Sequence, residues 1–164
     1  MALHDDLLQQ AWHLLEYDSG QASLRRAVSA AYYALFHLLI TESIDHLDAR
    51  LSPALKRRMR RAYAHADMDR ACKQLTSGGL PDALRETMTL PIEDDLIRIA
   101  KYFSDLQEAR FMADYDIGSD IAASFAETAC LRAQAAFELW AKVRKTPNAT
   151  VFLASLLLGN RWNR

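Results

Sequence analysis

The sequence predicts an all-α protein: an antiparallel up-and-down bundle of about five helices, with a short apolar helix at its C-terminal end. Apolar residues recur at helical spacing almost throughout, and no segment shows the sustained alternation of a strand. The run AVSAAYYALFHLLI, residues 27–40, contains no charged residue, Gly or Pro. It is shorter than the roughly 20 apolar residues that span a membrane and longer than an ordinary strand, so it predicts a buried central helix.

The first three helices follow from apolar spacing and from helix-start signals. Residues 3–16 predict a helix whose early Asp5 and Asp6 complement the positive end of its dipole. A turn at residues 18–20 separates it from the central helix, residues 22–47, and Ser52-Pro53 opens the third helix. The inner face of the first helix is predicted to consist of Leu7, Leu8, Ala11, Leu14 and Leu15.

The second half of the chain predicts a helical hairpin followed by an apolar tail. Residues 76–91 predict a loop with one helical turn at residues 82–87. One helix then runs from Ile92 to Gly118 and the next from Ser119 to about Lys145. We expect a bundle over residues 1–146 and a tail over residues 147–164. The apolar tail helix, residues 148–159, either docks on the bundle or is buried in a dimer interface.

Composition limits the classes of function. The formal net charge of −1 excludes a protein that coats nucleic acid by bulk electrostatics, so any such binding requires a local basic patch. The first ten residues lack the basic region and apolar stretch of a secretory signal. We therefore expect a cytoplasmic protein in which Cys72 and Cys130 are buried thiols, and in which the glycosylation sequon at Asn148 occurs by chance.

Two segments resemble one protein family. Residues 24–37, LRRAVSAAYYALFH, resemble the second-helix signature of HEPN proteins, which are small helical bundles. Residues 110–115, RFMADY, are similar to the arginine and Ala-Asp-Tyr motif on a later helix of one branch of that family. The resemblance covers roughly residues 3–143. It implies a HEPN-type homodimer in which two bundles build one cleft, related to toxin-antitoxin and phage-defence systems.

Arg110 is the first candidate site residue. It continues the apolar seam of its helix, and a buried guanidinium needs a carboxylate, which Asp114 supplies four residues on. Tyr33 or His37 could approach from the central helix, and Tyr115 completes the motif. Two interpretations stay open: a buried network that fixes the register of the bundle, or the lining of a cleft. His37 itself is either a satisfied core residue or part of a polar stripe with Ser29 and Tyr33. The seam consists of Leu96, Ile99, Phe103, Leu106, Arg110 and Ala113.

The second candidate is a basic segment, residues 56–61, followed by Tyr63 and His65. HEPN ribonucleases use an arginine and a histidine separated by four to six residues, which resembles Arg60 or Arg58 with His65 here. On a continuous helix Arg58 and His65 would lie about 20° apart, and Arg60 and His65 about 140° apart. In the family the motif usually sits on a later helix, which would favour Arg110 instead. A solvated helix face without function is the plain alternative.

The chemistry expected of this segment is metal-independent RNA cleavage. His65 would move a proton to or from the 2'-hydroxyl or the leaving 5'-oxygen, while Arg58 or Arg60 stabilises the phosphorane. Contacts to the RNA are expected from Lys56, Arg57, Arg61 and Tyr63, the first three to phosphates and the tyrosine by stacking on a base.

No metal or cofactor is expected, because the five histidines are scattered and no glycine-rich phosphate loop occurs. The preferred function is that of a HEPN-like protein that binds nucleic acid or nucleotides, and whether it also cleaves RNA, as a metal-independent endoribonuclease, stays open. The alternative is a non-catalytic helical partner of a nucleotidyltransferase antitoxin or another effector.

Overall fold

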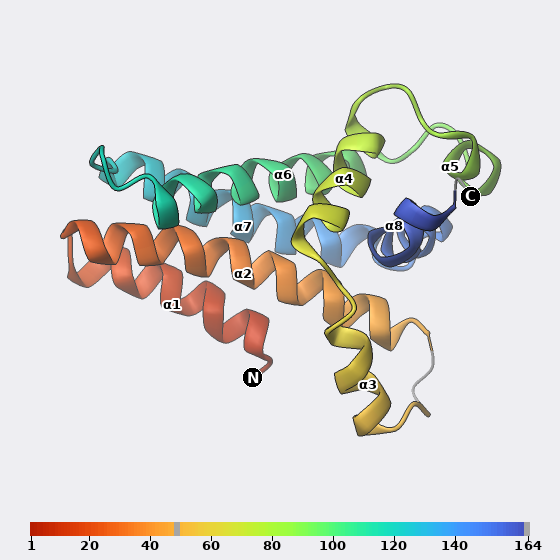
Figure 1. Ribbon diagram of the computed structural model, residues 1–164, viewed down its shortest axis with the longest axis horizontal. Helices are drawn as coiled ribbons and strands as arrows, with labels where there is room; N and C mark the ends of the chain where they lie inside the picture. Colours follow the sequence, from red (N-terminus) through yellow and green to blue (C-terminus); the bar gives the residue numbers. More distant parts are fainter. Residues whose placement is uncertain (48–49, 163–164) are drawn as a thin grey trace. The chain divides into compact units, whose positions relative to one another are not determined.

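The computed structural model describes residues 1–47 and 50–162, which contain helices and no strand (Figure 1). The predicted all-α class is confirmed, with more helices than expected. The elements of the described residues are α1 (Leu3–Tyr17), α2 (Gln21–Asp45), α3 (Pro53–Arg60), α4 (His65–Thr76), α5 (Asp82–Thr87), α6 (Asp94–Tyr115), α7 (Ala123–Val143), α8 (Pro147–Leu158) and the 3-10 turn η1 (Gly159–Arg161).

The chain forms two compact units. Unit 1 comprises Met1–Leu38 and Tyr102–Glu138, and unit 2 comprises Leu39–Lys101 and Leu139–Arg164. The long helices α2, α6 and α7 each contribute to both units. The predicted boundary after residue 146 stays a prediction; α8, which follows it, packs on α4 inside unit 2.

Unit 1 contains α1 and the adjoining parts of α2, α6 and α7, which run alongside one another (Figure 1). The seam of α6 is buried as predicted, since Phe103 and Leu106 are fully buried and Ala113 is 2% exposed. The predicted inner face of α1 is only partly correct. Ala11 is fully buried, whereas the four leucines around it are half-buried. The residue that α1 buries most completely is therefore the small one.

The turn between α6 and α7 is longer than predicted, since α6 ends at Tyr115 and α7 begins at Ala123. Arg25 explains part of this, because its guanidinium donates to the carbonyl oxygens of Ala113 (2.9 Å), Asp116 (2.8 Å) and Ser119 (2.6 Å). The side chain of Gln21 pairs with the backbone of Ile121 in both directions, at 2.9 and 2.8 Å. These five hydrogen bonds satisfy backbone groups that a longer helix would otherwise pair internally.

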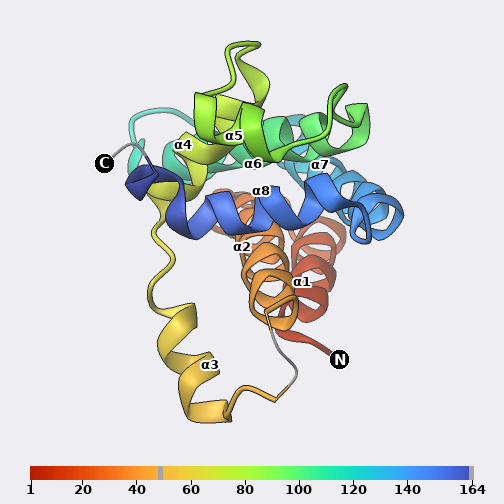
Figure 2. The ribbon, with the colours of Figure 1, turned by 90° about the vertical axis from the view of Figure 1, so that its right-hand side faces the viewer.

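Unit 2 is built around the apolar helix α8 (Figure 2). Its Phe152, Leu153 and Leu156 are buried, as are Met68 and Leu75 of α4, on which α8 packs. The tail helix thus buries its largest apolar side chains inside its own unit, while Leu158 at its end is 42% exposed. The C-terminal end of α2 is tied to the chain after α7, because Arg144 donates to both carboxylate oxygens of Glu42, at 3.0 and 2.9 Å. Such a bidentate pair holds two segments in a fixed orientation.

Asn148, at the start of α8, is 3% exposed, and both its side-chain oxygen and its side-chain nitrogen are hydrogen-bonded. Its side-chain amide donates to the carbonyl oxygen of Thr89 and to Glu93, and its oxygen accepts from the backbone N–H of Thr89, each at 2.8 Å. A glycan cannot be attached to an amide nitrogen that is buried and bonded in this way. Asn148 is therefore a structural residue in spite of its sequon.

By length and composition α2 would also pass as a membrane-spanning helix. Within the protein, 83% of its most apolar window is buried. The core helix of a soluble protein shows the same property, so this feature does not distinguish the two cases.

Candidate functional site

Arg110 lies in a polar centre inside unit 1. Its Nε is 3.0 Å from Oδ2 of Asp114, and a terminal nitrogen donates to the hydroxyl of Tyr33 at 3.2 Å. Asp114 in turn accepts a hydrogen bond from the hydroxyl of Ser29. We call Ser29, Tyr33, Arg110 and Asp114 the arginine centre. It links α2 to α6 through both charged and neutral groups.

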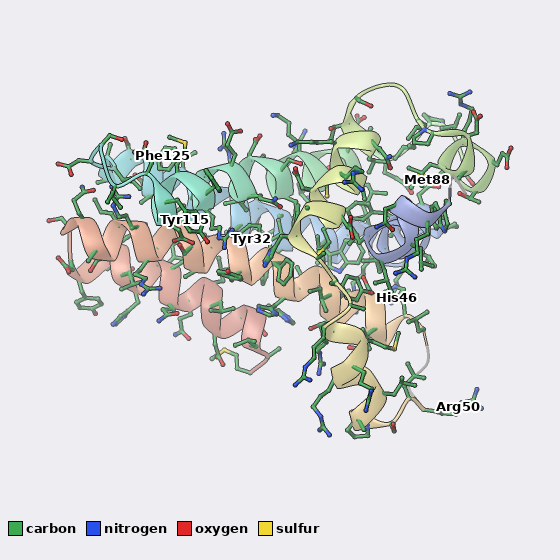
Figure 3. The ribbon with its side chains drawn as sticks, in the orientation of Figure 1. Tyr32, His46, Arg50, Met88, Tyr115 and Phe125 are labelled. Carbon is green, nitrogen blue, oxygen red and sulfur yellow. The ribbon has the colours of Figure 1, made fainter. Side chains whose placement is uncertain are left out.

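Three aromatic rings surround the guanidinium of the arginine centre. Its Cζ lies 5.7 Å from the ring centroid of Tyr32, 5.6 Å from that of Tyr33 and 5.7 Å from that of Tyr115. Tyr32 is fully buried on α2 and Tyr115 is 61% exposed on α6 (Figure 3). These distances are within the range of attractive cation–π contacts. The sequence predicted Tyr33 and Tyr115 as neighbours of Arg110, but it did not single out Tyr32.

The guanidinium of Arg110 keeps its charge. Burial lowers the pKa of Arg110, but the interactions with Tyr33, Asp114 and Tyr115 raise it by more, so the pKa lies above its ordinary value. Its side chain is 16% exposed. A cation that already faces a carboxylate and three tyrosine rings, and that donates to the hydroxyl of one of them, has little left to offer a phosphate. This geometry favours a network that fixes the bundle over a catalytic cleft.

His37 contacts the arginine centre through the ring of Tyr33. It stacks on Tyr33, with ring centroids 6.2 Å apart, and packs edge-on against Phe36 at 5.3 Å. Of the predicted polar stripe, Ser29 and Tyr33 both contact charged residues of the centre. His37 extends the stripe as a stacked, half-buried ring.

The basic segment forms α3, a short helix of unit 2 with no buried residue. Ser52 caps it by accepting a hydrogen bond from the N–H of Leu55 at 3.2 Å, and Pro53 occupies the first turn, as predicted. Figure 2 shows α3 standing apart from the other helices of its unit. The N-terminal cap therefore stabilises this helix, whereas no side chain of α3 is buried against another element.

Four arginines of this segment are exposed: Arg57, Arg58, Arg60 and Arg61. Among the described residues none of the four has an ion pair, whereas Lys56 pairs with Asp45 at 3.3 Å. A hollow of about 510 Å³ is lined by Ala54, Arg57, Arg58 and Arg61. Three of the four lining residues are therefore arginines, and we call this surface the basic hollow.

The structure corrects two expectations about this segment. The helix is interrupted, since α3 ends at Arg60 and α4 begins at His65, so angles measured around a continuous helix do not apply. Tyr63 is 8% exposed and hydrogen-bonds with Ser43, and burial raises its pKa. A ring held in this way is not available to stack on a base. His65 is half-buried at the start of α4, in unit 2, whereas Arg110 belongs to unit 1.

The two cysteines are unsuited to catalysis. Both are buried free thiols, Cys130 in unit 1 and Cys72 in unit 2. Burial, with a contribution from Glu127, raises the pKa of Cys130 to about 12, and burial together with Asp69 raises the pKa of Cys72 well above its ordinary value. Since the thiolate is the nucleophile, neither side chain offers one near neutral pH.

The chain matches no protein-family model, no curated protein and no solved structure. Within the part of the chain that the structure describes, no three residues among His, Cys, Asp and Glu are grouped so as to hold a metal ion. The geometry of unit 1 and of unit 2 is accordingly the basis for any proposal about function.

Proposed function

We propose that the protein binds RNA through the basic hollow of α3. The observation that carries this proposal is that Arg57, Arg58 and Arg61 line one hollow and have no ion-pair partner among the described residues. Unpaired like charges on one short helix are unfavourable by themselves. A polyanion that passes through the hollow would relieve this repulsion.

The chemistry of the hollow suits a phosphate backbone. A guanidinium presents a planar fork of donors that matches phosphate oxygens, and the displacement of counterions adds affinity at low salt. The total charge of the chain is near zero, so the attraction is local to α3. The hollow offers no aromatic ring, since Tyr63 is buried. The expected binding is therefore to the backbone, with little discrimination between bases.

The first test compares two triple variants. Replacing Arg57, Arg58 and Arg61 with glutamine is expected to weaken RNA binding and to reduce the slope of log K against log salt by about 2, since each lost phosphate contact contributes roughly 0.7. Fluorescence anisotropy over a salt series measures both quantities. The matched control replaces three exposed cations of unit 2 outside α3 and should leave the slope unchanged; these are Arg98, Lys142 and Lys145. Equal losses in both variants would contradict the assignment to α3.

The second part of the proposal is that the protein cleaves the RNA it binds. This part rests on the resemblance to HEPN ribonucleases and on the proposal that the chain forms a HEPN-type bundle. The 2'-hydroxyl would attack the adjacent phosphorus and lose its proton to His65, the bond from phosphorus to the 5'-oxygen would break, and the leaving 5'-oxygen would take a proton from water. Arg58 is the better candidate for stabilising the phosphorane, because it lines the hollow and Arg60 does not.

Cleavage is expected in EDTA and should yield 2',3'-cyclic phosphate and 5'-hydroxyl ends. His65→Ala should abolish it with RNA affinity retained. RNA that stays intact at high protein concentration while it binds would exclude catalysis and leave the binding function in place.

A second candidate function, docking of an effector protein such as a nucleotidyltransferase, is favoured by a different observation. Large apolar side chains are exposed at the C-terminal end of α6: Phe111 is 61% exposed, Met112 44%, Tyr115 61% and Ile117, just beyond the helix, 87%. Contiguous exposed apolar side chains are typical of protein interaction surfaces.

A further inference from the structure

The turn between α6 and α7 encloses a pocket in unit 1. Its volume is about 250 Å³, and its lining includes Met112 from the last turns of α6 and Phe125 from the first turn of α7. Ile121 and Ala122 add to the apolar lining, and Asp116 and Asp120 add two carboxylates. We call this the turn pocket. It is large enough for one or two side chains of a partner, and too small for a nucleotide.

Hydrogen bonds from side chains of α2 fix the backbone around the turn pocket. Arg25 fixes the carbonyl oxygens of Asp116 and Ser119, and Gln21 fixes both backbone groups of Ile121. Asp116 also accepts hydrogen bonds from the N–H of Gly118 and the hydroxyl of Ser119, each at 3.2 Å. A pocket framed in this way needs little ordering when it binds, which favours affinity.

The charges of the turn pocket select cations. Its lining contains two carboxylates and no basic residue. The nearby guanidinium of Arg25 is already occupied by three carbonyl oxygens. Asp120 is exposed and has no hydrogen bond or ion pair among the described residues. The negative end of the α6 dipole and the positive end of the α7 dipole both border the turn, so the preference for a positive group comes from the two carboxylates.

The pocket continues into the exposed apolar surface of α6. Met112 belongs to both, and Phe111 stacks against Tyr115 with ring centroids 5.1 Å apart. Figure 3 shows Tyr115 and Phe125 toward the same end of unit 1. A cation-selecting pocket next to exposed aromatic rings matches one kind of partner, a segment with basic and apolar side chains on adjacent positions.

We propose that the turn pocket docks a basic amphipathic segment of a partner protein. An apolar side chain of the segment enters between Met112 and Phe125, and a lysine or arginine beside it pairs with Asp120. Phe111 and Tyr115 cover the neighbouring apolar surface of the segment. This inference deepens the second candidate function and is independent of RNA binding, which uses α3 of unit 2.

The test uses two fluorescent peptides with the same charge. One is a helical peptide of leucine, lysine and arginine, and the other is its analogue with serine in place of leucine. The wild-type protein is expected to bind the leucine peptide at least tenfold more tightly. Asp120→Lys and Met112→Arg should each weaken that binding by about tenfold or more, which corresponds to about 1.4 kcal/mol. Two exposed residues outside the pocket supply matched controls, Glu86→Lys and Leu131→Arg, which should bind as the wild type does.

Several outcomes would overturn the proposal. Equal affinity for the two peptides would show charge attraction without a pocket, and loss in the controls would show a non-specific surface. Self-association of the wild type that Asp120→Lys abolishes would assign the pocket to a second copy of the chain instead. RNA binding is measured on the same variants and should be unchanged, so a failure here is distinct from a failure of the basic hollow.

Discussion

Replacement of Arg25 with methionine is expected to lower the free energy of unfolding by about 3 kcal/mol, because it removes donors from three carbonyl oxygens at once. The carbonyl oxygens of Ala113, Asp116 and Ser119 belong to the end of α6 and the turn that follows it. Without the guanidinium they would have to recruit water, and the turn would lose its attachment to α2. Chemical denaturation measures the change in stability.

Arg26 provides a matched control for Arg25. It is the adjacent residue, it is exposed, and it has no hydrogen bond or ion pair among the described residues. Arg26→Met should change the stability by less than about 0.5 kcal/mol, as is usual for exposed positions. Hydrogen exchange adds a local measurement, since amides of residues 116–122 should exchange faster in Arg25→Met alone. Equal destabilisation by the two substitutions would refute the role given to Arg25.

Replacement of Arg110 with methionine is expected to lower the free energy of unfolding by about 2 kcal/mol, for a different reason. The substitution leaves the carboxylate of Asp114 without its cation, and the loss of a partly buried pair, with side chains 16% and 28% exposed, costs more than the loss of an exposed one. It also removes the cation from the three tyrosine rings. The double variant Arg110→Met, Asp114→Ala should recover part of the loss, because it no longer leaves an unpaired charge.

The control for Arg110 is Arg132, which is 3.8 Å from Asp105 and has a side chain that is 39% exposed. Arg132→Met should cost about 0.5 kcal/mol or less, as is typical of exposed ion pairs. A double-mutant cycle on Arg110 and Asp114 gives their coupling directly. A coupling near zero would contradict the arginine centre as a structural network.

The fold class and most helix positions could be predicted because they depend on local patterns. The run of residues 27–40 lies within α2, the seam from Leu96 to Ala113 is buried along α6 apart from Arg110 itself, and the weak turn at residues 82–87 is α5. Ser52 caps α3 as the adjacent proline indicated. In each case the signal lies within a few residues of the feature that it predicts.

Features that depend on tertiary contacts could not be predicted in this way. Arg25 and Arg26 are the same residue type at adjacent positions, and only the fold shows that one ties down a turn while the other faces solvent. The break between α3 and α4 contains no Gly or Pro. It places Tyr63 where the ring is buried and bonded to Ser43, which removed a predicted RNA contact.

The division into two units also lay beyond the sequence. Apolar spacing identifies the helices, but it does not show that α2, α6 and α7 each contribute to both units. For the same reason, spacing along the chain does not decide between Arg110 and the arginines of residues 56–61 as the arginine of the HEPN motif. That choice stays a prediction of the resemblance.

The central claim is that RNA contacts the basic hollow of α3. Ultraviolet crosslinking of bound RNA followed by mass spectrometry of the peptides tests it directly. The account predicts crosslinks concentrated in residues 53–65, and their loss when Arg57, Arg58 and Arg61 are replaced with glutamine. Crosslinks that map instead to unit 1, and that survive this replacement, would contradict it.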